Sequence, residues 1–224
     1  SKNFIDPYRN LYSLCITNRD FKSLINIARR IIEIDKKNPL SHFQLAYALE
    51  VNGNLTQSIN FYNSAINLGF KDKKMIYNNL GNVYLLLKKI DKSIEFFSLS
   101  FEESQNDKII INNLIKAYIQ ARNIDKAEIF LKKAQVIDKN YEEYLHNEAD
   151  LLILKKQFDK AIIILKNLIK DYRTVKHSLL LCKIYFTVGE VDKGNKVIDE
   201  AMIYFPENPK VMNFKGTRDL LNGN

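Results

Sequence analysis

The chain has little glycine, proline or cysteine and no tryptophan: seven Gly, four Pro and two Cys in 224 residues. So few turn-forming residues argue against a β-sandwich and against a long flexible linker. No apolar run approaches the roughly 18 residues that a membrane span needs, and the N-terminus has no apolar signal core. A hydrophobic content of 46% suffices for a packed core. We therefore expect an ordered, all-helical, cytoplasmic protein. A secreted or lipid-anchored location stays open because the chain begins at Ser1.

The motifs of catalytic and metal sites are also missing. His42, His146 and His177 are scattered, with no cysteine or carboxylate at metal-ligand spacing. There is no G-x-S-x-G and no phosphate-binding glycine loop. Cys15 and Cys182 lie too far apart in the repeats for a disulfide, so we expect two buried thiols. The sequence predicts no enzyme activity, no cofactor and no metal.

The positive charge is spread along the chain. The net charge is +8. Residues 1–112 carry 15 basic and 11 acidic side chains, and residues 113–224 carry 19 and 15, so each half is +4. No basic arm stands out, and we interpret most of the charge as a solvated face. Nucleic acid is an unlikely partner, and RNA binding is only a distant alternative function.

One pattern recurs about every 34 residues and is clearest from Lys74 to Asp107. Apolar residues return there at spacings of three and four, which predicts two amphipathic helices with a turn at 88–90. We number the repeat from Lys74 as position 1. Position 7, where we expect the first core residue of each repeat, then reads Leu11, Leu45, Leu80, Leu114, Glu148 and Leu181, with a departure at Glu148. Position 20, which is mostly small, reads Leu24, Ser58, Ser93, Ala127, Ala161 and Gly194. Position 18 holds expected helix caps at Thr56, Asp91, Asp125, Asp159 and Asp192.

This order of Leu-Gly, Tyr, small and aromatic residues resembles the tetratricopeptide repeat. The pentatricopeptide repeat, which reads RNA, is the nearest alternative, but the small residues and the tyrosines at position 11 favour the first family. The resemblance implies an all-α, right-handed α-α superhelix forming a single domain over 5–224. Its helix pairs would span 5–38, 39–73, 74–107, 108–141, 142–174 and 175–208. A capping helix at 209–222 would cover the last pair with Val211, Met212, Phe214 and Leu220.

Repeat one departs from the pattern, with bulky Tyr12, Leu24 and Ile31 where small residues are usual. We expect it to be the N-terminal cap, although a docking partner would leave the same signature.

In the family, positions 2, 5, 6, 9, 12 and 13 of the first helix line a concave groove. Position 6 reads Asn10, Gln44, Asn79, Asn113 and Asn147, then breaks at Leu180. A carboxamide can bond both a C=O and an N–H of a peptide. With first helices about 10 Å apart, one amide would meet about every third residue of an extended chain. The column is similar to the asparagine ladder of O-linked N-acetylglucosamine transferase. The alternative is a solvated column with no ligand.

Further groove positions complete the candidate site. They are Phe43, Tyr47, Asn78, Asn82, Asn112, Lys116, His146, Asp150, Lys183 and Phe186. Phe43 could instead pack beneath the neighbouring repeat. The family's clamp for chaperone C-termini needs Lys, Asn, Asn, Lys and Arg, whereas this chain has Asn78, Asn82, Asn113, Glu143 and Asn147. All three cations are missing, so we predict no binding of a chaperone carboxylate.

The leading hypothesis is a protein-interaction module that binds an extended peptide or partner segment in the groove. The alternative is a structural assembly or scaffold factor that works through its end caps or by self-association.

Overall fold

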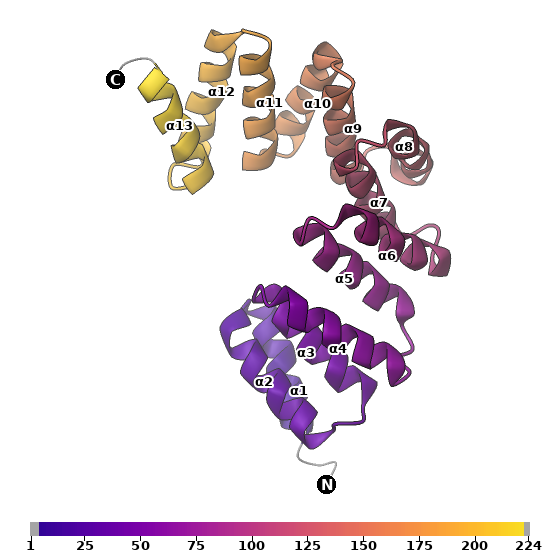
Figure 1. Ribbon diagram of the computed structural model, residues 1–224. Helices are drawn as coiled ribbons and strands as arrows, with labels where there is room; N and C mark the ends of the chain where they lie inside the picture. The colour runs from indigo at the N-terminus through magenta and orange to yellow at the C-terminus, as the bar shows by residue number, and fades with distance from the viewer. Residues whose placement is uncertain (1–4, 222–224) are drawn as a thin grey trace. The chain divides into compact units, whose positions relative to one another are not determined.

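The computed structural model describes residues 5–221, without the side chains of 217 and 219–221. Over this range the chain forms thirteen α-helices and no strand. Consecutive helices pack as pairs, which confirms the all-α helix-pair prediction (Figure 1). The helices are α1 (Asp6–Thr17), α2 (Phe21–Ile34), α3 (Pro39–Val51), α4 (Leu55–Asn67), α5 (Lys73–Leu86), α6 (Ile90–Glu103), α7 (Lys108–Gln120), α8 (Ile124–Asp138), α9 (Glu142–Leu154), α10 (Phe158–Asp171), α11 (Val175–Thr187), α12 (Val191–Tyr204) and α13 (Pro209–Leu221).

The first helix of each pair begins within one residue of the start predicted from the 34-residue period. The predicted last residue of the capping helix, 222, lies outside the described residues. The chain divides into two compact units, one ending at Ala117 and one beginning at Tyr118.

In the first unit, small residues let the two helices of a pair approach closely. Gly81 on α5 is buried against the ring of Phe97 on α6, and a Cβ added to Gly81 would lie 2.5 Å from Phe97 Cε1. The Ser93 hydroxyl donates a hydrogen bond of 2.8 Å to the Gly81 carbonyl. The contact therefore requires a residue without a side chain at position 81, and Ser93 adds a hydrogen bond across it.

Repeat one packs differently from the prediction. The position-7 residue Leu11 is 44% exposed, while its neighbour Tyr12 is 4% exposed and donates from its hydroxyl to the Gln44 carbonyl. Leu24 and Ile31, the other bulky residues, are fully buried in the same cluster. The prediction for Leu11 was wrong because α1 turns its Tyr12 face toward α2 and α3, about 100° from Leu11.

The predicted caps at position 18 were also wrong. The second helices begin one residue earlier, at the apolar residues Leu55, Ile90, Ile124, Phe158 and Val191. Their N-cap residues are Asn54, Lys89, Asn123, Gln157 and Glu190. Of these, Asn123 accepts a hydrogen bond from the Lys126 amide. The carboxylate of Asp91 and its equivalents lies inside the first turn instead, where it interacts favourably with the positive end of the helix.

The turn inside each helix pair uses a left-handed residue at position 15. This position has positive φ in all six pairs, at Arg19, Gly53, Lys88, Arg122, Lys156 and Gly189. Glycine adopts this conformation without cost, whereas the four longer residues hold it at a local energetic cost.

In the second unit, Ala161, Leu165, Leu168 and Leu181 form the centre of the core. The helix α13 packs on α12 and α11. Val211 is fully buried there, as predicted, but Met212 is 53% exposed because it lies about 100° around the helix from Val211. The predicted contribution of Leu220 falls on a side chain outside the described residues.

The thiols of Cys15 and Cys182 are free and buried, as predicted. No helix among the described residues is long and apolar enough to cross a membrane.

Candidate functional site

Two of the four position-6 amides of the first unit, Asn79 and Asn113, are engaged within the protein. The Asn113 side chain donates to Asn78 Oδ1 at 2.8 Å, and the Asn79 side chain donates to the Tyr62 hydroxyl at 3.0 Å. Gln44 and Asn113 are each only 9% exposed, whereas Asn10 is exposed. Asn79 and Asn113 therefore join neighbouring repeats, which reduces what their amides can offer to a peptide.

The remaining predicted residues of the first unit vary in exposure. Tyr47 packs against the core of repeats one and two. Asn112 is buried, and Asn82 and Lys116 are half-buried. Phe43 stacks on Phe70 with ring centroids 4.8 Å apart and 12° between the planes. Phe43 is half-buried, but Phe70 belongs to its own repeat, so packing of Phe43 beneath the neighbouring repeat stays a prediction.

Sequence reasoning missed a half-buried acid, Glu50. Its carboxylate accepts a hydrogen bond from the fully buried Tyr62, which in turn accepts from Asn79. Burial raises the pKa of Glu50 to about 7, and the Tyr62 hydrogen bond opposes the shift. A signal existed in the sequence: position 12 reads Ile16, Glu50, Leu85, Ile119, Ile153 and Phe186, so Glu50 is the one acid in an apolar column.

In the second unit, first helices of successive repeats line an open pocket of about 610 Å³. We call it the first-helix pocket; it lies between α9, α11 and α13. Three predicted residues meet there, His146, Asp150 and Lys183. The other lining residues, apart from Asn208 and Pro209, are apolar Val175, Leu179, Leu180 and Phe214 and the cations Lys176 and Lys210.

Most of these lining residues continue the predicted groove columns. Positions 2, 5, 6 and 9 of repeat six are Lys176, Leu179, Leu180 and Lys183, and positions 2 and 6 of the capping helix are Lys210 and Phe214. The stripe could therefore have been extended into repeat six and α13 from the sequence. Leu180, which breaks the amide column, is a lining residue of the pocket. Asn147 lies next to His146 on α9 but is only 1% exposed, and it does not line the pocket.

The histidines are not all scattered, which corrects the sequence interpretation. The rings of His146 and His177 lie 5.1 Å apart. His146 Nε2 is 3.5 Å from Asp150 Oδ2, and His177 Nε2 is 3.5 Å from Glu142 Oε1. His177 is fully buried, and burial lowers its pKa. Among the described residues, no group of three or more His, Cys, Asp or Glu is placed to hold a metal ion.

None of the residues at the positions of the chaperone clamp is a lysine or arginine, and one of them is the acid Glu143. Glu143 forms an ion pair with Lys176 at 3.0 Å. The absence of chaperone-tail binding stays a prediction.

Phe186, the last predicted groove residue, lies over Gly194 of α12. A Cβ added to Gly194 would be 2.5 Å from Phe186 Cε1, and Phe186 is 36% exposed. Its ring thus covers the close contact between α11 and α12.

Comparisons with known proteins show what this architecture is. Residues 76–107 match the family model of the tetratricopeptide repeat. No curated protein matches the chain. Among solved structures, the chain is similar to a tetratricopeptide repeat protein from Parabacteroides merdae, at 17% identity over 97% of this chain and 86% of that one, with a TM-score of 0.80.

Two further structures share the fold. One is from the APC/C hetero-tetramer Cut9-Hcn1, at 15% identity over 92% of this chain and 41% of that one, TM-score 0.75. The other is YrrB, a protein with an unusual peptide-binding site, at 16% identity over 84% of this chain and 97% of that one, TM-score 0.56. Proteins of this fold are typically non-catalytic. Residues 76–107 thus match a tetratricopeptide repeat, and the described helix pairs share the fold of tetratricopeptide-repeat structures, which is a general scaffold for protein–protein interaction.

Proposed function

We propose that this protein binds an extended segment of a partner protein in the first-helix pocket between α9, α11 and α13. The observation that carries the proposal is the pocket itself, because an open, partly apolar cavity is lined by the first-helix columns that face the groove in this family. YrrB and Cut9-Hcn1 share the fold and are, by description, a peptide-binding protein and part of a hetero-tetramer.

The charged residues of the first-helix pocket indicate which kind of partner segment would bind there. Three lysines and one aspartate line it, and Asp150 lies beside His146. Lys176 is already paired with Glu143, but no ion pair joins Lys183 or Lys210 to an acid in the described part of the chain. Leu179, Leu180 and Phe214 supply apolar surface between these cations. A segment with one or two large apolar side chains and a nearby carboxylate matches this lining.

The length of the segment follows from the helix spacing. Three first helices, about 10 Å apart, span about 20 Å. An extended chain advances about 3.3 Å per residue, so about six residues would cross the pocket.

The test begins with a partner isolated by affinity capture, whose sequence is then covered with overlapping labelled peptides of twelve residues. Fluorescence anisotropy on the full chain identifies the binding peptide. We expect the double change Lys183→Glu and Lys210→Glu to weaken that peptide at least tenfold, because both cations become repulsive to a carboxylate.

Lys160→Glu is the matched control, since Lys160 is an exposed lysine on a second helix, α10, and does not line the pocket. It should leave the affinity within twofold. Full-strength binding by the Lys183 and Lys210 double variant would refute the proposal, as would a partner that no short peptide can replace.

A further inference from the structure

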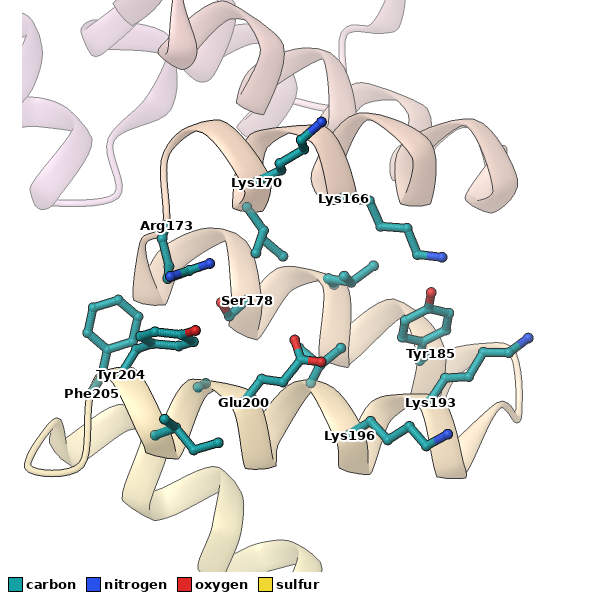
Figure 2. A pocket seen from close by; sticks show the side chains of 15 residues that line it. Lys166, Lys170, Arg173, Ser178, Tyr185, Lys193, Lys196, Glu200, Tyr204 and Phe205 are labelled. Carbon is teal, nitrogen blue, oxygen red and sulfur yellow. The ribbon is translucent and has the colours of Figure 1, made fainter.

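A larger groove lies between the second helices α10 and α12 of the second unit. It encloses about 750 Å³, and α11 forms its floor (Figure 2). We call it the second-helix groove. Its lining includes the apolar residues Ile169, Leu181, Val197 and Ala201. Ser178 and Tyr185 of α11 lie along the floor, with Tyr185 at one end (Figure 2). None of these residues is in the first-helix pocket, so the two sites are separate.

The rim of the second-helix groove gathers positive charge. Its charged residues are Lys166, Lys170, Arg173, Lys193, Lys196 and Glu200. Lys193 pairs with Glu190, but no acid among the described residues pairs with Lys166, Lys170 or Lys196. Arg173 lies 3.9 Å above the ring of Tyr204. Five cations and one acid thus gather around one groove, a local excess of positive charge that the even distribution along the sequence does not reveal.

The same position in the first unit offers an internal comparison. The groove between α2 and α4, with Leu45 and Leu49 of α3 as its floor, encloses only about 250 Å³. It carries one cation and one acid, Arg29 and Glu33. Phe61 lines it at position 23, where the second-helix groove has Val197.

Position 23 explains why one groove is open and the other is small. It reads Ile27, Phe61, Phe96, Phe130, Ile164 and Val197, so repeat six has the smallest side chain of the column. A valine in place of a phenylalanine leaves room above α11. The second-helix groove is thus both larger and more positively charged than the equivalent groove of the first unit, and both differences favour a binding site.

We propose that the second-helix groove binds an acidic amphipathic helix of a partner protein, at a site separate from the first-helix pocket. The apolar lining residues favour a protein segment over a nucleic acid, because a phosphate backbone has nothing to place on Leu181 or Val197. Glu200 sits in the middle of the rim with cations on either side of it (Figure 2). A continuous polyanion would be repelled there, whereas a helix with central apolar residues and acidic ends would not.

The dimensions set the length of this helix. The lining residues of α12 run from Lys193 to Tyr204, about 16 Å at 1.5 Å per residue. A partner helix of about three turns matches that length and would present apolar residues at i, i+3, i+4 and i+7.

A displayed library of random 16-residue peptides tests the proposal. The library is selected on the full chain and depleted on the Val197→Phe variant, which fills the groove. Val197→Phe should fold, because Phe61, Phe96 and Phe130 occupy the same position in other repeats; a circular dichroism melt checks this. We expect the surviving peptides to carry apolar residues at helical spacing and an excess of Asp and Glu.

Charge-reversed variants test the same peptides without touching the core. The double change Lys166→Glu and Lys170→Glu should weaken binding at least tenfold, and raising salt from 50 to 300 mM should weaken binding to the unmodified chain. Arg29→Glu is the matched control, because Arg29 and Lys166 both occupy position 25. Arg29→Glu and Lys183→Glu should each change the affinity less than twofold.

Three results would overturn the proposal. The first is that no selected peptide binds the unmodified chain more tightly than it binds the Val197→Phe variant. The second is that the selected peptides are neutral or basic, or still bind the Lys166 and Lys170 double variant. The third is that phosphatidylserine vesicles or a poly(dT) strand bind more tightly than the selected peptides and lose binding in the same variants, which would assign the groove to a membrane or a nucleic acid.

Discussion

Adding one methyl group at Gly81 should destabilise the protein. The Cβ of Gly81→Ala would lie 2.5 Å from Cε1 and 2.9 Å from Cγ of the buried Phe97 ring. Carbon atoms normally approach to about 3.5 Å, so the ring or α6 has to move by about 1 Å. Overpacking of this kind costs about 1–3 kcal/mol, against a gain of about 1 kcal/mol because alanine is the better helix former. The net loss should reach up to about 2 kcal/mol.

Gly216→Ala is the control for this prediction. Gly216 also lies inside a helix, α13, but no atom lies within 4 Å of an added Cβ. This change should therefore stabilise the protein, by up to about 1 kcal/mol. Urea unfolding followed by circular dichroism gives both values. If Gly81→Ala were as stable as Gly216→Ala, the close packing of α5 on α6 would be wrong.

Three other predictions concern a turn and two titratable groups. Lys88→Gly should raise the free energy of unfolding by about 0.5–1 kcal/mol in urea, because glycine accepts the positive φ of this turn; an unchanged value would contradict the left-handed turn. The pKa of Glu50 is raised to about 7, so its contribution to stability is present below about pH 4.5 and is lost as pH rises through 7. Glu50→Gln should therefore gain stability over the unmodified chain at pH 8 but not at pH 4.5, and equal curves at both pH values would argue against the half-buried carboxyl. The pKa of His177 is lowered by burial, so its contribution is present above about pH 6.5 and is lost as pH falls. An NMR titration should find the midpoint of its imidazole below the ordinary value of about 6.5, and a normal titration midpoint would refute its burial.

The helix pairs could be predicted from the sequence because they depend on local periodicity. Apolar residues at spacings of three and four placed each first helix to within one residue. The cap prediction was wrong at Asp91 because an apolar residue, Ile90, starts the helix just before it. The prediction that Leu11 is buried was wrong because the period predicts which face of a helix is apolar, but not which neighbouring helices cover that face.

The candidate site was only partly predictable for a related reason. His146 and His177 occupy different columns of successive repeats, so a column-by-column comparison does not bring them together. The second-helix groove depends on Val197, an ordinary residue that matters only because phenylalanine usually stands in its place. Its cations lie on two helices separated by a third, and their proximity is a property of packing. Periodicity predicts elements, whereas the depth and charge of a surface depend on how neighbouring elements pack.

The helix α11 contributes to both proposed sites. Leu179 and Lys183 line the first-helix pocket, while Leu181 and Tyr185 form part of the second-helix groove. A ligand on either side that shifts or immobilises α11 acts on the opposite side through the same helix. Thermodynamic linkage then requires the effect to be mutual: the factor by which the first ligand changes the affinity of the second equals the factor by which the second changes that of the first. One short helix would thus make two binding events interdependent without direct contact between the ligands.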